Sequence, residues 1–149
     1  MFRTGFAVAA LAFATTAVLA QSGALEQRNA LMKSVWRDAW RPVTQMVRGQ
    51  EPYEQAKVDA AFAKLAEIAA KLPPLWPANS IGVAPDANFS SSAKIWENKA
   101  DFEAKLANFT KAVNENRSKA KNLDELKTVY QVVNKTCDDC HEPYRVRVR

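Results

Sequence analysis

Cys137-Asp138-Asp139-Cys140-His141, near the C-terminal end of the chain, is the stretch around which the rest of the sequence is organised. It contains both cysteines and the one histidine of the 149 residues. Two thiols three positions apart, followed directly by an imidazole, form the C-x-x-C-H pattern of a c-type haem attachment site. On a helix Cys137 and His141 project from one face. We therefore expect Cys137 and Cys140 to hold one covalent haem c as thioethers and His141 to be the proximal iron ligand.

Three other interpretations of this motif are weaker. A structural zinc site needs four ligands, and the chain has three Cys or His residues in all. A C-x-x-C redox pair expects a thioredoxin-like βαβ context, which the sequence pattern does not indicate. A plain disulfide would leave the single histidine unexplained.

Residues Met1 to Ala20 have the features of a secretory signal peptide: Arg3 in a short positive region, an apolar run and a small-residue site at Val18-Leu19-Ala20. We expect cleavage after Ala20, a periplasmic protein with no membrane anchor, and one mature domain at residues 21–149. The apolar run is shorter than the about 20 residues of a membrane span, although an uncleaved anchor is the alternative. Export also keeps the thiols away from the reducing cytosol.

The formal net charge of +5 falls to +4 without Arg3. Modest basicity of this kind does not indicate nucleic acid binding, and no Lys/Arg block with interleaved aromatic residues is present. We expect no nucleic acid partner.

Four segments show helical periodicity, and none alternates convincingly with period two. The first spans about residues 24–47, where Pro42 should kink it and Gly49 should end it. The second is expected to begin at Pro52, a residue favoured in the first turn, and to stop at Pro73-Pro74.

The third helix follows Ser90-Ser91-Ser92, any of which can cap it. The fourth begins at Asn122, with Glu125 three positions on as in a capping box, and Pro143 should end or bend it. Four amphipathic helices predict an all-α protein, an antiparallel four-helix bundle with the haem among the apolar stripes. No sequence remains for a sheet.

Two further segments have open roles. The long connection at residues 72–92 is rich in proline, and its Trp76 either covers an edge of the haem or belongs to a stiff surface crossover. At the C-terminus, Arg145, Arg147 and Arg149 either steer an acidic redox partner or belong to a frayed end.

A C-terminal C-x-x-C-H on the last of four helices, behind a secretory leader, resembles the class II c-type cytochromes, the cytochrome c-prime family. The similarity covers essentially the whole mature chain. The further matching motifs are Arg28-x-x-x-Met32, Gly49-Gln50-Glu51-Pro52-Tyr53, Ser91-Ser92-Ala93-Lys94-Ile95-Trp96 and Tyr144-Arg145. The resemblance implies electron transfer with redox partner proteins, and family members often form a homodimer through the first two helices.

The family divides by the group that faces the iron opposite the histidine. A first-helix methionine is the sixth ligand in its low-spin branch, and an apolar side chain blocks that face in its high-spin branch. Met32 occupies the matching position here and is expected to be the distal haem iron ligand; Met46, beyond Pro42, fits less well. The alternative for Met32 is core filling, for which methionine is well suited.

The sequence therefore predicts a periplasmic electron-transfer cytochrome with His/Met ligation. The alternative is a high-spin protein that binds nitric oxide or carbon monoxide. We expect no enzyme activity, because a second histidine for acid–base work is absent and Asp138 and Asp139 suit a solvated spacer better than a catalytic pair.

Overall fold

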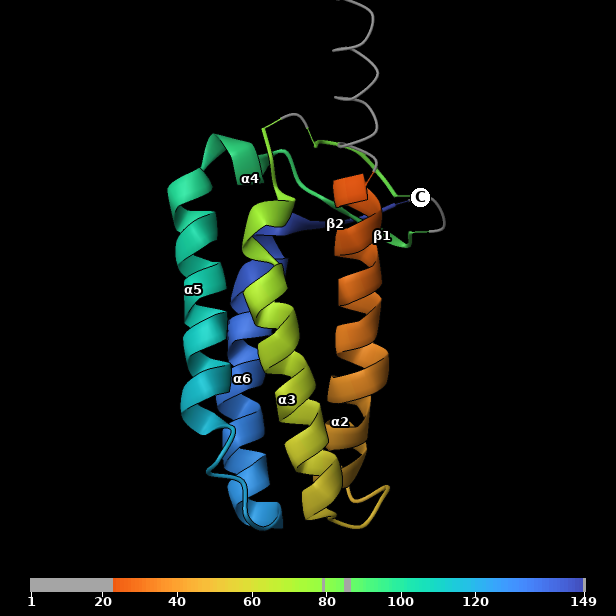
Figure 1. Cartoon of the computed structure of the whole chain (residues 1–149), viewed down its shortest axis with the longest axis vertical. Helices are drawn as coiled ribbons and strands as arrows, with labels where there is room; N and C mark the ends of the chain where they lie inside the picture. Colours follow the sequence, from red (N-terminus) through yellow and green to blue (C-terminus); the bar gives the residue numbers. More distant parts are fainter. Residues whose placement is uncertain (1–22, 79, 85–86, 149) are drawn as a thin grey trace, which may run out of the picture.

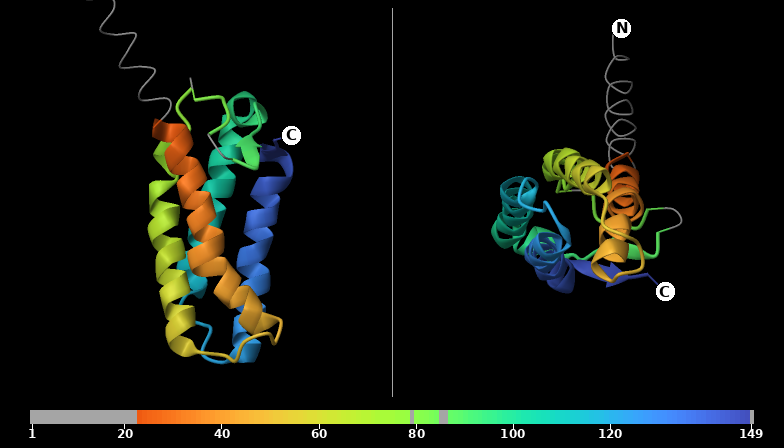
Figure 2. Two further views of the ribbon diagram at one scale, coloured as in Figure 1. Left: turned by 90° about the vertical axis from the view of Figure 1, so that its right-hand side faces the viewer. Right: turned by 90° about the horizontal axis from the view of Figure 1, so that it is seen from below.

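Four long helical segments lie side by side along one axis, as the four apolar stripes predict (Figures 1 and 2). The computed structural model describes residues 23–78, 80–84 and 87–148. The predicted signal peptide lies outside the described residues, so cleavage after Ala20 stays a prediction. None of the described helices is both long enough and apolar enough to cross a membrane.

The elements follow one another in a simple order. The first segment is helical over residues 23–34 and continues through η1 (Val35–Trp40) and α2 (Arg41–Val47). The second is α3 (Gln55–Lys71), followed by η2 (Pro73–Leu75); the third is α4 (Lys94–Glu97) with α5 (Lys99–Asn116); the fourth is α6 (Leu123–Tyr144). Strands β1 (Phe89–Ser91) and β2 (Arg145–Arg147) complete the set.

The first segment deviates from α-helical geometry directly before Pro42, where the sequence predicts a kink. Element η1 is a π-helix, and the Arg41 N–H at its end bonds to the Trp36 carbonyl, five residues back. Proline lacks a backbone N–H donor and crowds the turn that precedes it. The π-helical turn of η1 lies directly before Pro42, where this crowding acts. Gly49 ends the segment as predicted, with φ of 70° and its N–H bonded to the Met46 carbonyl.

The predicted start of the second helix at Pro52 is wrong. Helix α3 begins three residues later, and Glu54 before it is extended. Tertiary contacts hold this segment away from helical geometry: the Tyr53 hydroxyl donates to the Ala120 carbonyl (3.1 Å), and the Glu54 N–H donates to Met46 Sδ (3.4 Å). The predicted stop is confirmed, because Pro73 and Pro74 form the separate 3₁₀ turn η2.

The expectation that no sheet forms is also wrong, because β1 and β2 pair as a two-stranded antiparallel sheet. Phe89 lies opposite Arg147 and Ser91 opposite Arg145. Three-residue strands are too short for a period-two pattern to be recognised. A frayed C-terminus is thus incorrect for residues 145–148, since the Val148 N–H also bonds to the Asn88 carbonyl; Arg149 lies outside the described residues.

The start of helix α6 is confirmed. The Asn122 side chain accepts hydrogen bonds from the N–H groups of Asp124 and Glu125, and Glu125 Oε2 accepts one from the Lys121 N–H. Pro143 lies in the last turn, and the helix continues one residue further before the chain enters β2. The core between the helices is apolar, with Phe62, Leu65 and Val133 almost fully buried.

Candidate functional site

A cavity of about 760 Å³ lies between the first helical segment, α6 and the 76–91 segment. Its volume is in the range of small-molecule and cofactor sites. All four predicted site residues line it: Cys137, Cys140 and His141 from α6, and Met32 from the first segment. Trp76 lines the same cavity, so the 72–92 connection does contribute to the site and is not only a surface crossover.

The two thiols are free and partly buried on the inner stripe of α6. Burial raises the pKa of the Cys137 thiol to about 12, and the nearby Asp138 carboxylate acts in the same direction. Burial likewise raises the pKa of the Cys140 thiol to about 11. Both side chains are therefore neutral thiols at physiological pH rather than reactive thiolates.

His141 is neutral in this environment. Its pKa is lowered by burial and, to a smaller extent, by the positive charge of Arg145. Arg145 Nη1 lies 3.2 Å from His141 Nδ1. The neutral imidazole is the form that binds a metal.

Of the two methionines in the described residues, Met32 is the one at the cavity. Met46 is fully buried and its sulfur accepts the Glu54 N–H, away from the cavity lining. Met32, the methionine that the sequence favours as the distal ligand, is thus the one that lines the same cavity as the haem motif.

Arg28 lies in the first segment, one turn before Met32, and was not predicted as a site residue of its own. Its side chain lines the cavity and is 5% exposed. It donates to the Leu75 carbonyl (2.9 Å), to Ser80 Oγ (2.9 Å) and to the Ser80 carbonyl (2.8 Å). Every one of these acceptors is neutral, so a buried cation at the cavity has no carboxylate partner among them. In the sequence, the signal that could have indicated a site role for Arg28 is a basic residue among the apolar positions of the first helical stripe.

A second group of residues joins the first segment to α6. The Trp40 indole stacks on Tyr130, with ring centroids 4.9 Å apart, and donates from Nε1 to Asn134 Oδ1 (3.0 Å). Asn134 Nδ2 in turn donates to Asp138 Oδ2 (2.8 Å), inside the haem motif. Tyr130, Asn134 and Asp138 recur every four residues, so one stripe of α6 holds Trp40. We call Trp40, Tyr130 and Asn134 the Trp40 clamp.

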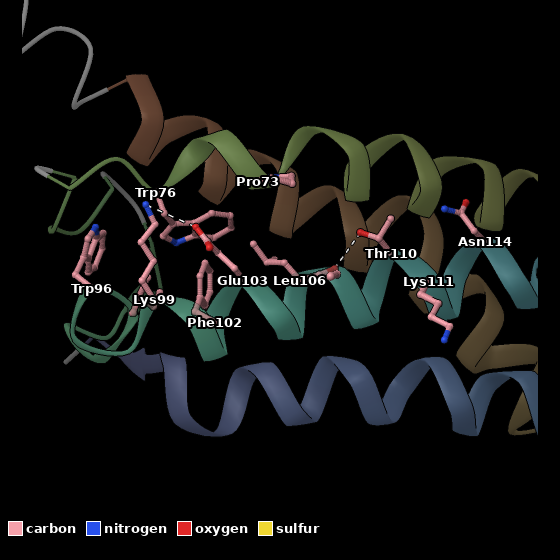
Figure 3. A pocket seen from close by; sticks show the side chains of 12 residues that line it. Pro73, Trp76, Trp96, Lys99, Phe102, Glu103, Leu106, Thr110, Lys111 and Asn114 are labelled. Carbon is pink, nitrogen blue, oxygen red and sulfur yellow. Dashed lines mark hydrogen bonds and ion pairs between the residues drawn. The ribbon is translucent and has the colours of Figure 1, made fainter.

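A smaller cavity of about 520 Å³ lies on the other side of Trp76 and Phe102, along α5 (Figure 3). Several of its polar side chains already have partners: Lys99 pairs with Glu103 (3.6 Å), and the Thr110 hydroxyl donates to the Leu106 carbonyl (3.0 Å). It brings no titratable group together with the haem motif.

Residues 23–145 match the family model described as Cytochrome C'. The chain belongs to the cytochrome c′ family. It is 38% identical over 146 residues to cytochrome c-556 of Rhodopseudomonas palustris, with 97% of each chain covered. It is 34% identical over 149 residues to cytochrome c-555 of Bradyrhizobium diazoefficiens, with both chains fully covered. The structure of cytochrome c′ from Rhodopseudomonas palustris superposes with a TM-score of 0.76 at 29% identity, over 85% of this chain and 98% of that chain.

Membership of the cytochrome c′ family makes the protein a c-type cytochrome of electron transfer with one covalent haem c. The residues present fit that group. Two thiols and an imidazole in C-x-x-C-H order face one cavity together with a thioether. The buried Arg28 guanidinium, which has only neutral acceptors, suits a ligand that carries carboxylates, as haem does through its propionates.

Proposed function

We propose that this cytochrome is an exported, periplasmic electron carrier whose haem is attached through Cys137 and Cys140 and whose iron is bound by His141 and Met32. One observation carries the proposal: the two thiols and the imidazole of α6 meet the Met32 thioether of the first segment in a single cavity. Met32 and His141 belong to two different helical segments of one bundle, whose packing would hold the two side chains in a set relation.

The haem supplies a one-electron iron couple, whose potential His/Met ligation raises. The chain contributes the ligands, a cavity of low polarity and the Trp40 clamp between the two ligand-bearing helices. A rigid pair of ligands should need little rearrangement between the two oxidation states. Electron transfer, rather than catalysis, also agrees with the single histidine and with Asp138 being hydrogen-bonded to Asn134.

The periplasmic location rests on the predicted signal peptide and on the haem motif, whose haem would be attached after export. Mass spectrometry of the exported protein tests both points. The expected mass is that of residues 21–149 plus one haem. Haem that extracts into acid acetone from the wild-type protein would contradict attachment through Cys137 and Cys140.

Met32→Leu tests the distal ligand, with Met46→Leu as the matched control. Both changes keep side-chain volume and remove a sulfur atom, so each should cost little packing energy. We expect the wild-type ferric protein and the Met46→Leu variant to be low-spin, with the weak near-infrared band of sulfur–iron coordination. Met32→Leu should be high-spin, lose that band and show a lower reduction potential.

Two other outcomes would change the assignment. If the wild-type protein is high-spin and binds carbon monoxide rapidly, Met32 is core filling and the gas-binding function becomes the better one. If Met32→Leu remains low-spin, another side chain holds the iron, and Lys33, which lines the cavity, is the first to replace.

A further inference from the structure

We propose that the mouth of the haem cavity is a docking surface for an electron-transfer protein with an acidic contact face. The inference deepens the proposed electron-carrier function and rests on it. The surface consists of Trp36, Phe89, Arg145 and Arg147, and we call it the mouth surface. Trp36, Phe89 and Arg145 line the cavity, and Arg147 lies opposite Phe89 in the small sheet.

Large apolar side chains are unusually exposed here. The Trp36 residue is 54% exposed and Phe89 is 47% exposed. Elsewhere the helices present ion pairs to solvent, as where Lys64 and Lys71 both bind Glu67. Exposed aromatic residues that line the same functional cavity point to an interaction site.

The charge around the cavity is predominantly positive. Its charged lining residues among those the structure describes are Arg28, Lys33, Arg37, Arg145 and the carboxylate Asp138. Arg37 is paired with Asp38 at 2.5 Å, Arg28 is buried, and the carboxylates of a bound haem offset part of the remaining charge. Together with Lys33, the arginines of β2 therefore supply much of the positive charge at the mouth.

Those arginines are held in place by the fold. Arg145 Cζ lies 4.6 Å from the centroid of the Phe89 ring, and β2 is hydrogen-bonded to β1. No ion pair between described residues includes Arg145 or Arg147. An ordered strand thus presents cations with no acidic partner beside an exposed aromatic ring, where a helix surface would have neutralised them.

This composition suits an acidic protein better than a neutral one. Tryptophan and arginine are the residues that most often dominate binding energy at protein interfaces. Positive charge on one surface and negative charge on the other speeds association and fixes orientation. One electron crosses the interface from the ferrous cytochrome to the partner's oxidised centre, and no bond is formed or broken.

The charge of the surface is tested by stopped-flow oxidation of the ferrous protein with two probes, anionic hexacyanoferrate(III) and cationic tris(phenanthroline)cobalt(III). Arg147→Glu is compared with Lys121→Glu, an identical change in charge before α6. The 22 residues of α6 separate that site from β2, which lies at the other end of the bundle (Figure 1). That length is about 33 Å, several Debye lengths at ordinary ionic strength.

At an ionic strength of about 0.1 M, where the Debye length is about 10 Å, Arg147→Glu should slow the reaction with hexacyanoferrate(III) about five-fold and speed the reaction with the cobalt complex. Lys121→Glu should change both rates by less than about two-fold, and salt should remove the difference between the variants. Equal effects of the two variants would overturn the proposal, because electrons would then leave the protein elsewhere.

The apolar part is tested with a zinc-substituted acidic blue-copper protein, whose binding to the cytochrome is followed by NMR. Trp36→Ser is compared with Val132→Ser, which removes another exposed apolar side chain (46% exposed) outside the cavity lining. Trp36→Ser should weaken binding about ten-fold and Val132→Ser less than about two-fold. Equal affinities for both variants would remove Trp36 from the docking surface and refute the proposal.

Two controls separate this proposal from others. Sedimentation equilibrium reports whether Trp36→Ser or Arg147→Glu changes the oligomeric state; if either does, the surface joins two copies of the chain and the docking proposal fails. Reversible one-electron voltammetry of the wild-type protein reports on the electron-carrier function itself. Reversible voltammetry without a mouth-surface effect refutes only the docking site, whereas loss of reversibility refutes both.

Discussion

Replacing Arg28 by leucine should destabilise the protein and lower its reduction potential together. Arg28 is 5% exposed, and its guanidinium donates to three acceptors, the Leu75 carbonyl, Ser80 Oγ and the Ser80 carbonyl. It also lies 5.6 Å from the Trp76 ring centroid and 5.9 Å from that of Trp96. Leucine fills much of the volume but leaves the Leu75 and Ser80 acceptors without this donor.

The size of the effect follows from these contacts. Each buried acceptor that loses its partner costs about 1–3 kcal/mol, and relief from burying a cation returns part of that sum. We expect a net loss of about 2–4 kcal/mol in the free energy of unfolding. For the potential, a unit charge about 10 Å from a bound iron would favour the reduced state by roughly 1.7 kcal/mol at an effective dielectric constant of about 20. Removing it should therefore lower the potential by tens of millivolts.

Guanidinium chloride unfolding of the haem-loaded protein, followed by far-UV circular dichroism, measures the stability, and voltammetry measures the potential. Arg28→Lys is the control: it keeps the charge, loses the planar fork, and should lower stability while leaving the potential close to the wild-type value. If Arg28→Leu leaves both stability and potential unchanged, Arg28 is not a buried cation of the haem cavity in solution.

Three other predictions test the frame around the site. Asn134→Leu removes the acceptor of the Trp40 indole and should lower the free energy of unfolding by about 1–2 kcal/mol. The sulfur–iron band of this variant should also disappear at a pH closer to neutral than in the wild-type protein. Burial and the hydrogen bond to Asp101 raise the Tyr144 pKa to about 12; because the unfolded chain loses this proton near 10, stability should fall as pH rises from about 10 to 12, and Tyr144→Phe should flatten that part of the profile. Gly49→Ala places a Cβ at φ of 70°, so thermal unfolding should show a loss of about 1 kcal/mol.

The bundle was predictable because each helix carries a long, regular apolar stripe. Val58, Leu65 and Leu72 on the second stripe are all buried, and Asn122 begins the fourth helix as its side-chain chemistry dictates. The placement of Cys137, Cys140 and His141 on one helix was predictable for a similar reason, since spacing along one helix is local. Their role in holding the haem stays a prediction. The start of α3 was not, because contacts of Tyr53 and Glu54 with distant parts of the chain override the local preference of Pro52.

The β1–β2 sheet and the Trp40 clamp could not be read from the sequence. Both depend on residues far apart in the chain: Phe89 meets Arg147, and Trp40 meets Asn134. A serine-rich run and a short basic tail carry no periodicity that would pair them. Only the closed bundle, which brings the ends of α6 and the long connection together, gives these residues their partners.

The Trp40 clamp and the β1–β2 sheet together explain how Met32 on the first segment can keep a fixed position relative to α6. Met32 lies eight residues before Trp40, with the π-helical turn of η1 between them. Such a turn relaxes the register of the first segment, and a free helix could shift Met32 relative to α6. Trp40 fixes the far side of that turn to the same stripe of α6 that carries Cys137 and His141, while Arg28 fixes the near side to the connection through Leu75 and Ser80. The connection is itself tied to the end of α6 by β1 and β2. Met32 is therefore held between two anchors that both lead back to α6, which is the arrangement that the proposed distal ligand would need in order to stay in place during electron transfer.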